Sequence, residues 1–177
     1  MRRIIKVLFV SAAAALVWAP VQARADGFFS PWAGTQFGSN INNGRAGVGI
    51  NAGGMGAGVI GGEVDFGFSP SFFGTKTDFG NNTLLNVMGN LIVGVPIGGQ
   101  HGAGVRPYVT GGVGLVRTQI DGGQVFHPAT SNNELGTDLG AGVMGYFNDH
   151  AGLRGDLRYF RTSSLHWWRL SAGVVIR

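Results

Sequence analysis

The sequence has no cysteine and few charged residues, and no long apolar run follows its first 25 residues. Without cysteine there can be no disulfide and no thiolate metal site. Charged residues make up 12% of the chain, against about 25% in an average soluble domain, which argues against a water-soluble enzyme. Because Gly or a polar residue interrupts every later apolar run, no transmembrane helix is predicted there. Glycine, by contrast, is abundant, at 33 of 177 residues.

The first 25 residues have the pattern of a secretory signal peptide. A basic start that contains Arg2, Arg3 and Lys6 precedes an apolar run at residues 7–19, and the segment ends in the small residues Ala23 and Ala25. The apolar run is shorter than the roughly 20 residues that span a bilayer as a helix. We therefore expect a signal peptide at residues 1–25 and one mature domain at residues 26–177.

Removal of this leader changes the net charge. Four of the 13 basic residues and none of the 9 acidic residues lie in the leader, so the mature chain is formally neutral. A nucleic-acid-binding surface needs a basic stripe. No nucleic-acid partner is therefore expected.

The mature chain alternates apolar residues with polar residues or Gly, which is the period of a β-strand. In 82–95, for example, Leu85, Val87 and Leu91 share one face, whereas Asn86 and Asn90 share the other. Short turns at one end and mostly longer loops at the other are typical of an up-and-down meander with both termini at the short-turn end. The predicted strands are 31–38, 46–53, 58–68, 82–95, 105–118, 134–147, 150–161 and 166–177.

The composition of the two faces decides what surrounds the sheet. A soluble sandwich exposes a face rich in Lys, Glu and Thr. Here the less apolar face is dominated by Gly, with a few charges on particular strands, which suits the crowded inside of a closed eight-stranded barrel. The apolar face then contacts lipid. The prediction is an all-β fold, an eight-stranded antiparallel up-and-down transmembrane β-barrel.

Aromatic residues on the apolar face support this interpretation. Phe66, Phe68, Tyr159 and Trp168 fall at the long-loop ends of their strands, and Phe147 falls at the short-turn end. Aromatic girdles occupy these positions in outer-membrane barrels, at the two membrane interfaces. We therefore predict an aromatic girdle made of these five residues.

Three segments carry a resemblance to a known family. "RPYVTGGVGL" at 106–115, "GLRGDLRYFR" at 152–161 and "GGEVDFGFSPSFFG" at 61–74 resemble strands of the small eight-stranded outer-membrane β-barrel proteins of the outer membrane protein A transmembrane-domain type. The resemblance covers most of residues 28–177. Such barrels usually end in an aromatic residue that belongs to the assembly signal, whereas this sequence ends in "GVVIR".

The resemblance implies a location and a set of partners. It implies residence in a Gram-negative outer membrane, in contact with membrane lipid and lipopolysaccharide. It also implies delivery by periplasmic chaperones and insertion by the barrel assembly machinery. A monomer is expected, with a structural or porin-like role.

Strand parity places seven charged residues inside the predicted barrel. Because unpaired charges in so narrow a space are costly, they should form an ion-pair network. Small barrels are filled rather than open, so the network is predicted to be a structural plug. A gated pathway for a small solute or ion is the alternative. The seven residues are Glu63, Asp65, Asp138, Arg154, Asp156, Arg158 and Arg169.

An enzyme is not expected, and no cofactor or metal site is predicted. A lipid hydrolase would need Ser, His and an acid to converge, and "RTSSLHWW" offers Ser163, Ser164 and His166 near Asp156. Ser and His in a short loop are more often solvated turn residues. The other histidines, His101, His127 and His150, are isolated in the sequence and lack metal-ligand spacing. No helix follows the Gly clusters, so a phosphate loop is excluded.

Surface recognition is a further alternative. The predicted loops 69–81 and 119–133 are long and polar, apart from Phe72 and Phe73, which are expected at the membrane interface. Adhesion or ligand binding is often carried by loops of this kind.

Overall fold

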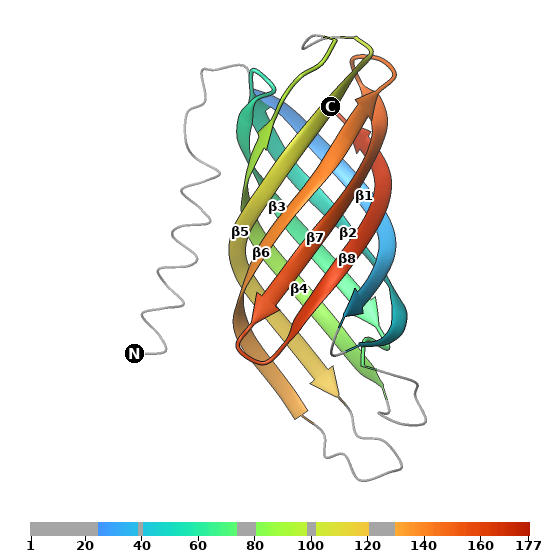
Figure 1. Ribbon diagram of the computed structural model, residues 1–177, viewed down its shortest axis with the longest axis vertical. Coiled ribbons are helices and arrows are strands. Elements are labelled where there is room, and N and C mark those ends of the chain that lie inside the picture. The colour runs from blue at the N-terminus through green and yellow to red at the C-terminus, as the bar shows by residue number, and fades with distance from the viewer. Residues whose placement is uncertain (1–24, 39–40, 74–80, 99–101, 121–129) are drawn as a thin grey trace.

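The computed structural model describes residues 25–38, 41–73, 81–98, 102–120 and 130–177. Each strand pairs antiparallel with the next, and β8 pairs with β1 to close the barrel (Figure 1). In this part of the chain, no helix has the length and apolar character needed to cross a membrane. The predicted fold class is confirmed. The strands are β1 Ala25–Gly38, β2 Ile41–Gly56, β3 Ile60–Pro70, β4 Asn82–Gly94, β5 Gly104–Ile120, β6 Thr130–Tyr146, β7 Ala151–Thr162 and β8 His166–Ile176.

The start of β1 and the end of β8 lie at the same end of the barrel, as predicted. Phe29 of β1 is the register partner of Ile176 of β8. The β2–β3, β4–β5 and β6–β7 connections lie at this end as well, near the label C in Figure 1. We term it the terminal end, and the opposite end the loop end. In outer-membrane barrels the short turns face the periplasm, which assigns the terminal end to that side.

The barrel is apolar outside and polar inside. Val143 and Leu157 on the outer surface are 45% and 40% exposed, whereas Glu63 and Arg158 inside are 3% and 0% exposed. This is the reverse of a soluble sandwich, in which the apolar face is buried. It follows that the outer surface is built for a lipid environment.

The first two strands are longer than predicted. β1 begins at Ala25 instead of residue 31, and β2 begins at Ile41 instead of residue 46. The predicted loop 39–45 was therefore wrong over 41–45, and residues 39–40 lie outside the described ranges. Pro31 explains the misplaced start of β1, because proline lacks an N–H group. The pairing of β1 with β8 is interrupted there, between Phe29 and Trp32, without a change of register.

The fifth and sixth strands are also longer than predicted. β5 continues to Ile120, which pairs with Thr130 at the start of β6. The predicted loop 119–133 was therefore wrong at both ends, because residues 119–120 belong to β5 and residues 130–133 belong to β6. The predicted signal peptide at residues 1–25 falls outside the described residues, apart from Ala25 at the start of β1.

The β2–β3 connection is a tight hairpin. Val59 N donates a hydrogen bond to Gly56 O at 2.9 Å. Ala57 and Gly58 between them both have positive φ, at 49° and 68°. Two positive φ values characterise the type I′ turn, which matches the right-handed twist of paired strands. Gly58 supplies the second at no steric cost.

Candidate functional site

The inside of the barrel is filled by side chains in three layers. A cluster of buried apolar residues lies near each end, and the seven predicted charged residues lie between the two clusters. Along β4, for example, Ile92 belongs to one cluster, Asn90 contacts the charged layer, and Leu84 belongs to the other cluster. The terminal plug is Phe28, Met55, Ile92, Tyr108, Met144, Tyr146 and Val175, and the loop-end plug is Phe72, Leu84, Met88, Val116, Phe160 and Trp167.

These apolar plugs correct the sequence interpretation, which assigned the inward face to Gly and ions. Phe160 and Trp167 stack with their ring centroids 4.9 Å apart. Phe72 was expected at the membrane interface, but it is fully buried and lies edge-on to Trp167 at 5.6 Å. Parity with Arg158 and Arg169 could have placed Phe160 and Trp167 inside, because each lies an even number of residues away.

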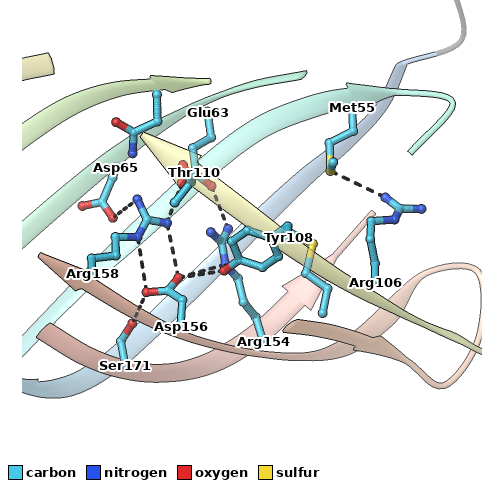
Figure 2. Close-up of polar contacts among 12 residues, drawn as sticks. Met55, Glu63, Asp65, Arg106, Tyr108, Thr110, Arg154, Asp156, Arg158 and Ser171 are labelled. Carbon is cyan, nitrogen blue, oxygen red and sulfur yellow. Dashed lines mark hydrogen bonds and ion pairs between the residues drawn. The ribbon is translucent and has the colours of Figure 1, made fainter. Parts of the chain in front are cut away.

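Arg158 is the centre of the charged layer (Figure 2). Its Nη2 lies 2.5 Å from Glu63 Oε1 and 3.2 Å from Asp156 Oδ2. Its Nη1 lies 3.4 Å from both Asp65 Oδ2 and Asp138 Oδ2. One guanidinium from β7 therefore contacts all four carboxylates, two of which come from β3 across the barrel.

Arg154 and Tyr108 extend the network towards the terminal end. Arg154 Nη1 pairs with Glu63 Oε2 at 2.8 Å, and its Nε donates to the Tyr108 hydroxyl at 2.7 Å. That hydroxyl donates to Asp156 Oδ2 at 2.9 Å. Ser171 Oγ donates to Asp156 Oδ1 at 2.9 Å. Tyr108 thus joins the ionic layer to the terminal plug, a role that sequence reasoning missed.

Arg169 and Asp65 form a two-point contact towards the loop end. Arg169 Nη1 donates to Asp65 Oδ1 at 3.0 Å, and its Nη2 donates to Asp65 Oδ2. The Arg169 guanidinium also lies over the Trp32 ring, with Cζ 4.1 Å from the ring centroid. Cation–π contacts and paired hydrogen bonds both orient a guanidinium. The structure therefore brings all seven predicted charged residues together.

Asp138 has the weakest ties to the layer. Its Oδ2 receives Asn90 Nδ2 at 3.2 Å and Arg158 Nη1 at 3.4 Å, whereas its buried Oδ1 has no hydrogen-bond partner. The seven residues comprise four carboxylates and three guanidiniums, so one carboxylate charge is not balanced within the layer. Removing the charge of Asp138 should therefore disturb the layer less than removing the charge of any of the other three carboxylates.

This imbalance gives a prediction for the asparagine variants. Asp138→Asn is expected to change the free energy of unfolding by less than about 1 kcal/mol, because it removes the unbalanced charge and keeps the shape. Asp65→Asn should cost about 2 kcal/mol, because it weakens charged hydrogen bonds to Arg169. Urea unfolding in phospholipid vesicles measures both. If the two variants lost the same free energy of unfolding, the excess carboxylate charge in the layer would not affect stability.

Gly142 allows the close approach that the Tyr108 contacts need. A Cβ on Gly142 would lie 2.5 Å from the Tyr108 hydroxyl and 2.6 Å from Asp156 Cβ. Gly145 lies on the same strand and faces outward, and a Cβ there would meet nothing within 4 Å. The two positions make a matched pair for testing the crowding of the lumen.

We predict that Gly142→Ala lowers the free energy of unfolding by about 1–3 kcal/mol, the usual cost of overpacking. Gly145→Ala should leave it unchanged within about 0.5 kcal/mol. Urea unfolding of the two variants beside the parent protein measures the difference. A Gly142→Ala protein as stable as Gly145→Ala would mean that the lumen is more loosely filled than the structure shows.

The predicted girdle residues all lie on the outer surface. Phe66, Phe68, Phe147 and Trp168 are exposed there, and Tyr159 is half-buried against Trp168, with ring centroids 5.0 Å apart. Sequence reasoning omitted two further outward aromatics of β1. Phe29 is 44% exposed near the terminal end, and Phe37 is 39% exposed beside Trp168 near the loop end. Phe29 lies before the predicted start of this strand, whereas Phe37 lies within the predicted strand 31–38 and was not singled out.

Asp156 does not lie with the other residues considered for a hydrolase. Asp156 is buried in the charged layer, whereas His166 is exposed and lies 6.3 Å from the Tyr159 ring on the outer surface. Ser164 Oγ donates to Glu134 Oε1 at 2.7 Å instead. In the described part of the chain, no group of three or more His, Asp or Glu could hold a metal ion. His101 and His127, and most of both long loops, lie outside that part.

A closed antiparallel barrel of eight strands with an apolar outer surface and a polar, filled centre defines an outer-membrane-type β-barrel. The chain belongs to the family of the outer membrane protein beta-barrel domain, whose model matches residues 8–177. It is therefore a bacterial outer-membrane protein. A sequence comparison with curated proteins gives no match.

Solved structures share the fold. Neisserial surface protein A (NspA) is 17% identical, with a TM-score of 0.64, covering 85% of this chain and 95% of NspA. The N-terminal β-barrel domain of Pseudomonas aeruginosa OprF is 14% identical, with a TM-score of 0.58, covering 86% and 98%. The attachment invasion locus protein Ail of Yersinia pestis is 15% identical, with a TM-score of 0.53, covering 85% and 99%. At these identities the comparison concerns the fold.

Proposed function

We propose that this protein is a structural outer-membrane barrel whose lumen is permanently closed. The observation that carries the proposal is the position of Arg158, whose guanidinium contacts four carboxylates from three strands in the middle of the barrel. Opening a path would separate several of these contacts in a water-poor interior, where an unpaired charge costs several kcal/mol. The plug is therefore expected to stay in place.

The two apolar plugs add a second barrier. The loop-end plug stacks Phe160 on Trp167 and sets Phe72 against Trp167. The terminal plug includes Met55, Met144 and Val175, all without exposed surface. An ion or solute would have to displace both plugs and the charged layer between them. These contacts favour a permanently plugged lumen over a gated channel.

Planar-bilayer recording tests the proposal. The purified barrel should give no single-channel steps at either polarity, and liposomes that contain it should not swell in solutions of small sugars. Reproducible conductance steps from the unmodified protein would support the gated channel and overturn the closed lumen. The heat-modifiable gel shift of the same preparation confirms that the tested protein is folded.

The proposal includes the absence of enzymatic activity. Its support is that Asp156 is buried in the charged layer, whereas Ser164 and His166 are exposed. A phospholipase assay in mixed micelles with the Ser164→Ala variant as control tests it. Hydrolysis that is lost in the variant would contradict a purely structural role.

A lipid partner fits the outer surface at the loop end. A shallow hollow there is lined by Phe68, Thr83, Leu85, Arg117 and Gln119. The apolar side chains can contact an acyl chain, and Arg117, which is exposed, can contact a phosphate. We expect lipopolysaccharide to occupy this position in the outer leaflet. Arg117→Gln should reduce the lipopolysaccharide that co-purifies with the barrel, and an unchanged amount would contradict the assignment.

A further inference from the structure

One buried cation does not belong to the charged layer. Arg106 of β5 lies near the terminal end and is 2% exposed. Figure 2 shows it apart from the Arg158 network, beside Met55. Its Nη1 donates only to Met55 Sδ, at 3.8 Å, which is a weak acceptor. Within the described part of the chain, no acidic side chain forms an ion pair with it.

The unpaired atoms of Arg106 form one edge of its guanidinium. Nε and Nη2 are both buried without a hydrogen-bond partner. These two N–H groups point the same way and form the fork that binds carboxylate or phosphate with two parallel hydrogen bonds. A buried guanidinium without a counter-ion is costly. An oxyanion has the charge and the acceptor geometry that this fork requires.

The β2–β3 turn lies against this edge of the guanidinium. A Cβ on Gly58 would lie 2.6 Å from Arg106 Nη2 and 3.2 Å from its Nε. Because residue 58 is Gly, the backbone of the turn can lie directly against the fork. The turn thus forms a cradle at the guanidinium edge.

A second cation faces the same place. Arg106 Cζ lies 5.5 Å from the centroid of the Tyr146 ring, and Arg177 Cζ lies 3.6 Å from that centroid. Two guanidiniums therefore lie around one ring at the periplasmic mouth. A phosphate group, with up to two negative charges and three or more acceptor oxygens, suits this charge better than a single carboxylate.

We infer that Arg106 and Arg177, with the Gly58 turn and Tyr146, form a binding site for a phosphate oxyanion at the periplasmic mouth of the barrel. The phosphate comes either from solution or from the headgroup of a phospholipid in the inner leaflet. Arg106 binds it through its Nε and Nη2 fork, and Arg177 contributes the second charge. Binding supplies acceptors for two buried N–H groups that have no hydrogen-bond partner among the described residues.

Thermal unfolding of the full barrel in dodecyl maltoside micelles tests the inference. One arm titrates inorganic phosphate against chloride at constant ionic strength. The other arm adds phosphatidylglycerol, with diacylglycerol as the phosphate-free lipid control. The parent protein should gain several degrees in Tm in at least one arm, since a ligand of the folded state stabilises it. A response to phosphate identifies the free ion, and a response to phosphatidylglycerol alone identifies the headgroup.

Two variants of Arg106 define the role of the fork. Arg106→Met should be at least as stable as the parent protein without phosphate, because it removes a buried uncompensated charge, and should not respond in either arm. Arg106→Lys keeps the charge but not the fork and should bind at least tenfold more weakly. The inference is overturned if the parent protein responds in neither arm, if Arg106→Met responds equally, or if Arg106→Lys binds as tightly as Arg106.

Asp26 is the acidic residue of the protein that would compete with phosphate for Arg106. It lies at the terminal end of β1, where its register partner is Met55. Asp26→Asn is expected to leave both the stability in phosphate-free micelles and the phosphate response unchanged. A clear loss of stability in Asp26→Asn, matched by a loss in Arg106→Met, would show that Arg106 is already paired and would refute the site.

Discussion

Replacing Arg158 with methionine is expected to lower the free energy of unfolding by about 3–5 kcal/mol, the usual cost of removing one partner from a buried ion pair. Arg158 is fully buried and contacts Glu63 at 2.5 Å, Asp156 at 3.2 Å, and Asp65 and Asp138 at 3.4 Å. Methionine fills a similar volume but leaves these carboxylates facing one another. Urea unfolding in phosphatidylcholine vesicles, followed by tryptophan fluorescence, measures the loss.

Arg161→Met is the matched control for this experiment. Arg161 lies on the same strand, faces outward and is exposed, so its replacement should change stability by no more than about 0.5 kcal/mol. Bilayer recording of Arg158→Met should show no conductance, because both apolar plugs remain. If Arg158→Met were no less stable than Arg161→Met, the charged layer would not hold the barrel together.

Introducing arginine at Val64 should cost about 2–4 kcal/mol, the cost of a cation on the lipid-facing side of a barrel near the bilayer midplane. Val64 lies near the middle of β3, faces outward and is 52% exposed. On a soluble protein, arginine at so exposed a position would be nearly neutral. The size of the loss therefore reports the surroundings of the outer surface. Urea unfolding in phosphatidylcholine vesicles measures it.

Thr83→Arg provides the comparison. Thr83 lies at the loop end of β4 and faces outward, where the cost of arginine should fall to about 0–1 kcal/mol. A Val64→Arg protein as stable as Thr83→Arg in vesicles would place Val64 in water. That result would reject the lipid-facing assignment, whatever the shape of the barrel.

Most of the fold could be predicted from the two-residue period of the strands. The alternation of Glu63 and Asp65 with Val64 and Phe66 was enough to assign the two faces, because side chains on a strand point to opposite sides in turn. The composition of the less apolar face, which is mainly Gly with a few charges, then identified the other face as the one that meets lipid. Closure into eight strands followed from the number of alternating segments.

The pairing inside the lumen could not be predicted from the sequence. Parity placed Arg158 and Arg169 on the inward face, but the register between strands decides that Arg169 takes Asp65 in two contacts while Arg158 contacts four carboxylates. The register depends on the lengths of all the strands, and the starts of β1 and β2 were misplaced. Pro31 and the Asn42-Asn43-Gly44 run at the start of β2 are more typical of turns than of strands.

The apolar plugs were missed for a different reason. Phe160 and Trp167 have the parity of the inward face, but bulky aromatics in a membrane barrel suggest the interface. Their burial depends on the small cross-section of an eight-stranded barrel, which large side chains can fill. Arg106 was overlooked because the two faces of the predicted strand 105–118 were not assigned.

The most direct test of the account is a cysteine scan along β4, which is practical because the natural sequence has no cysteine. Each position receives a spin label in vesicles, and its collision rates with oxygen and with a water-soluble nickel complex are measured. The account predicts high oxygen access at 85, 87, 89, 91 and 93, with low access to both reagents at 84, 86, 88, 90 and 92. High nickel access at the first set, or oxygen access that does not alternate, would contradict a barrel with lipid outside and a sealed centre.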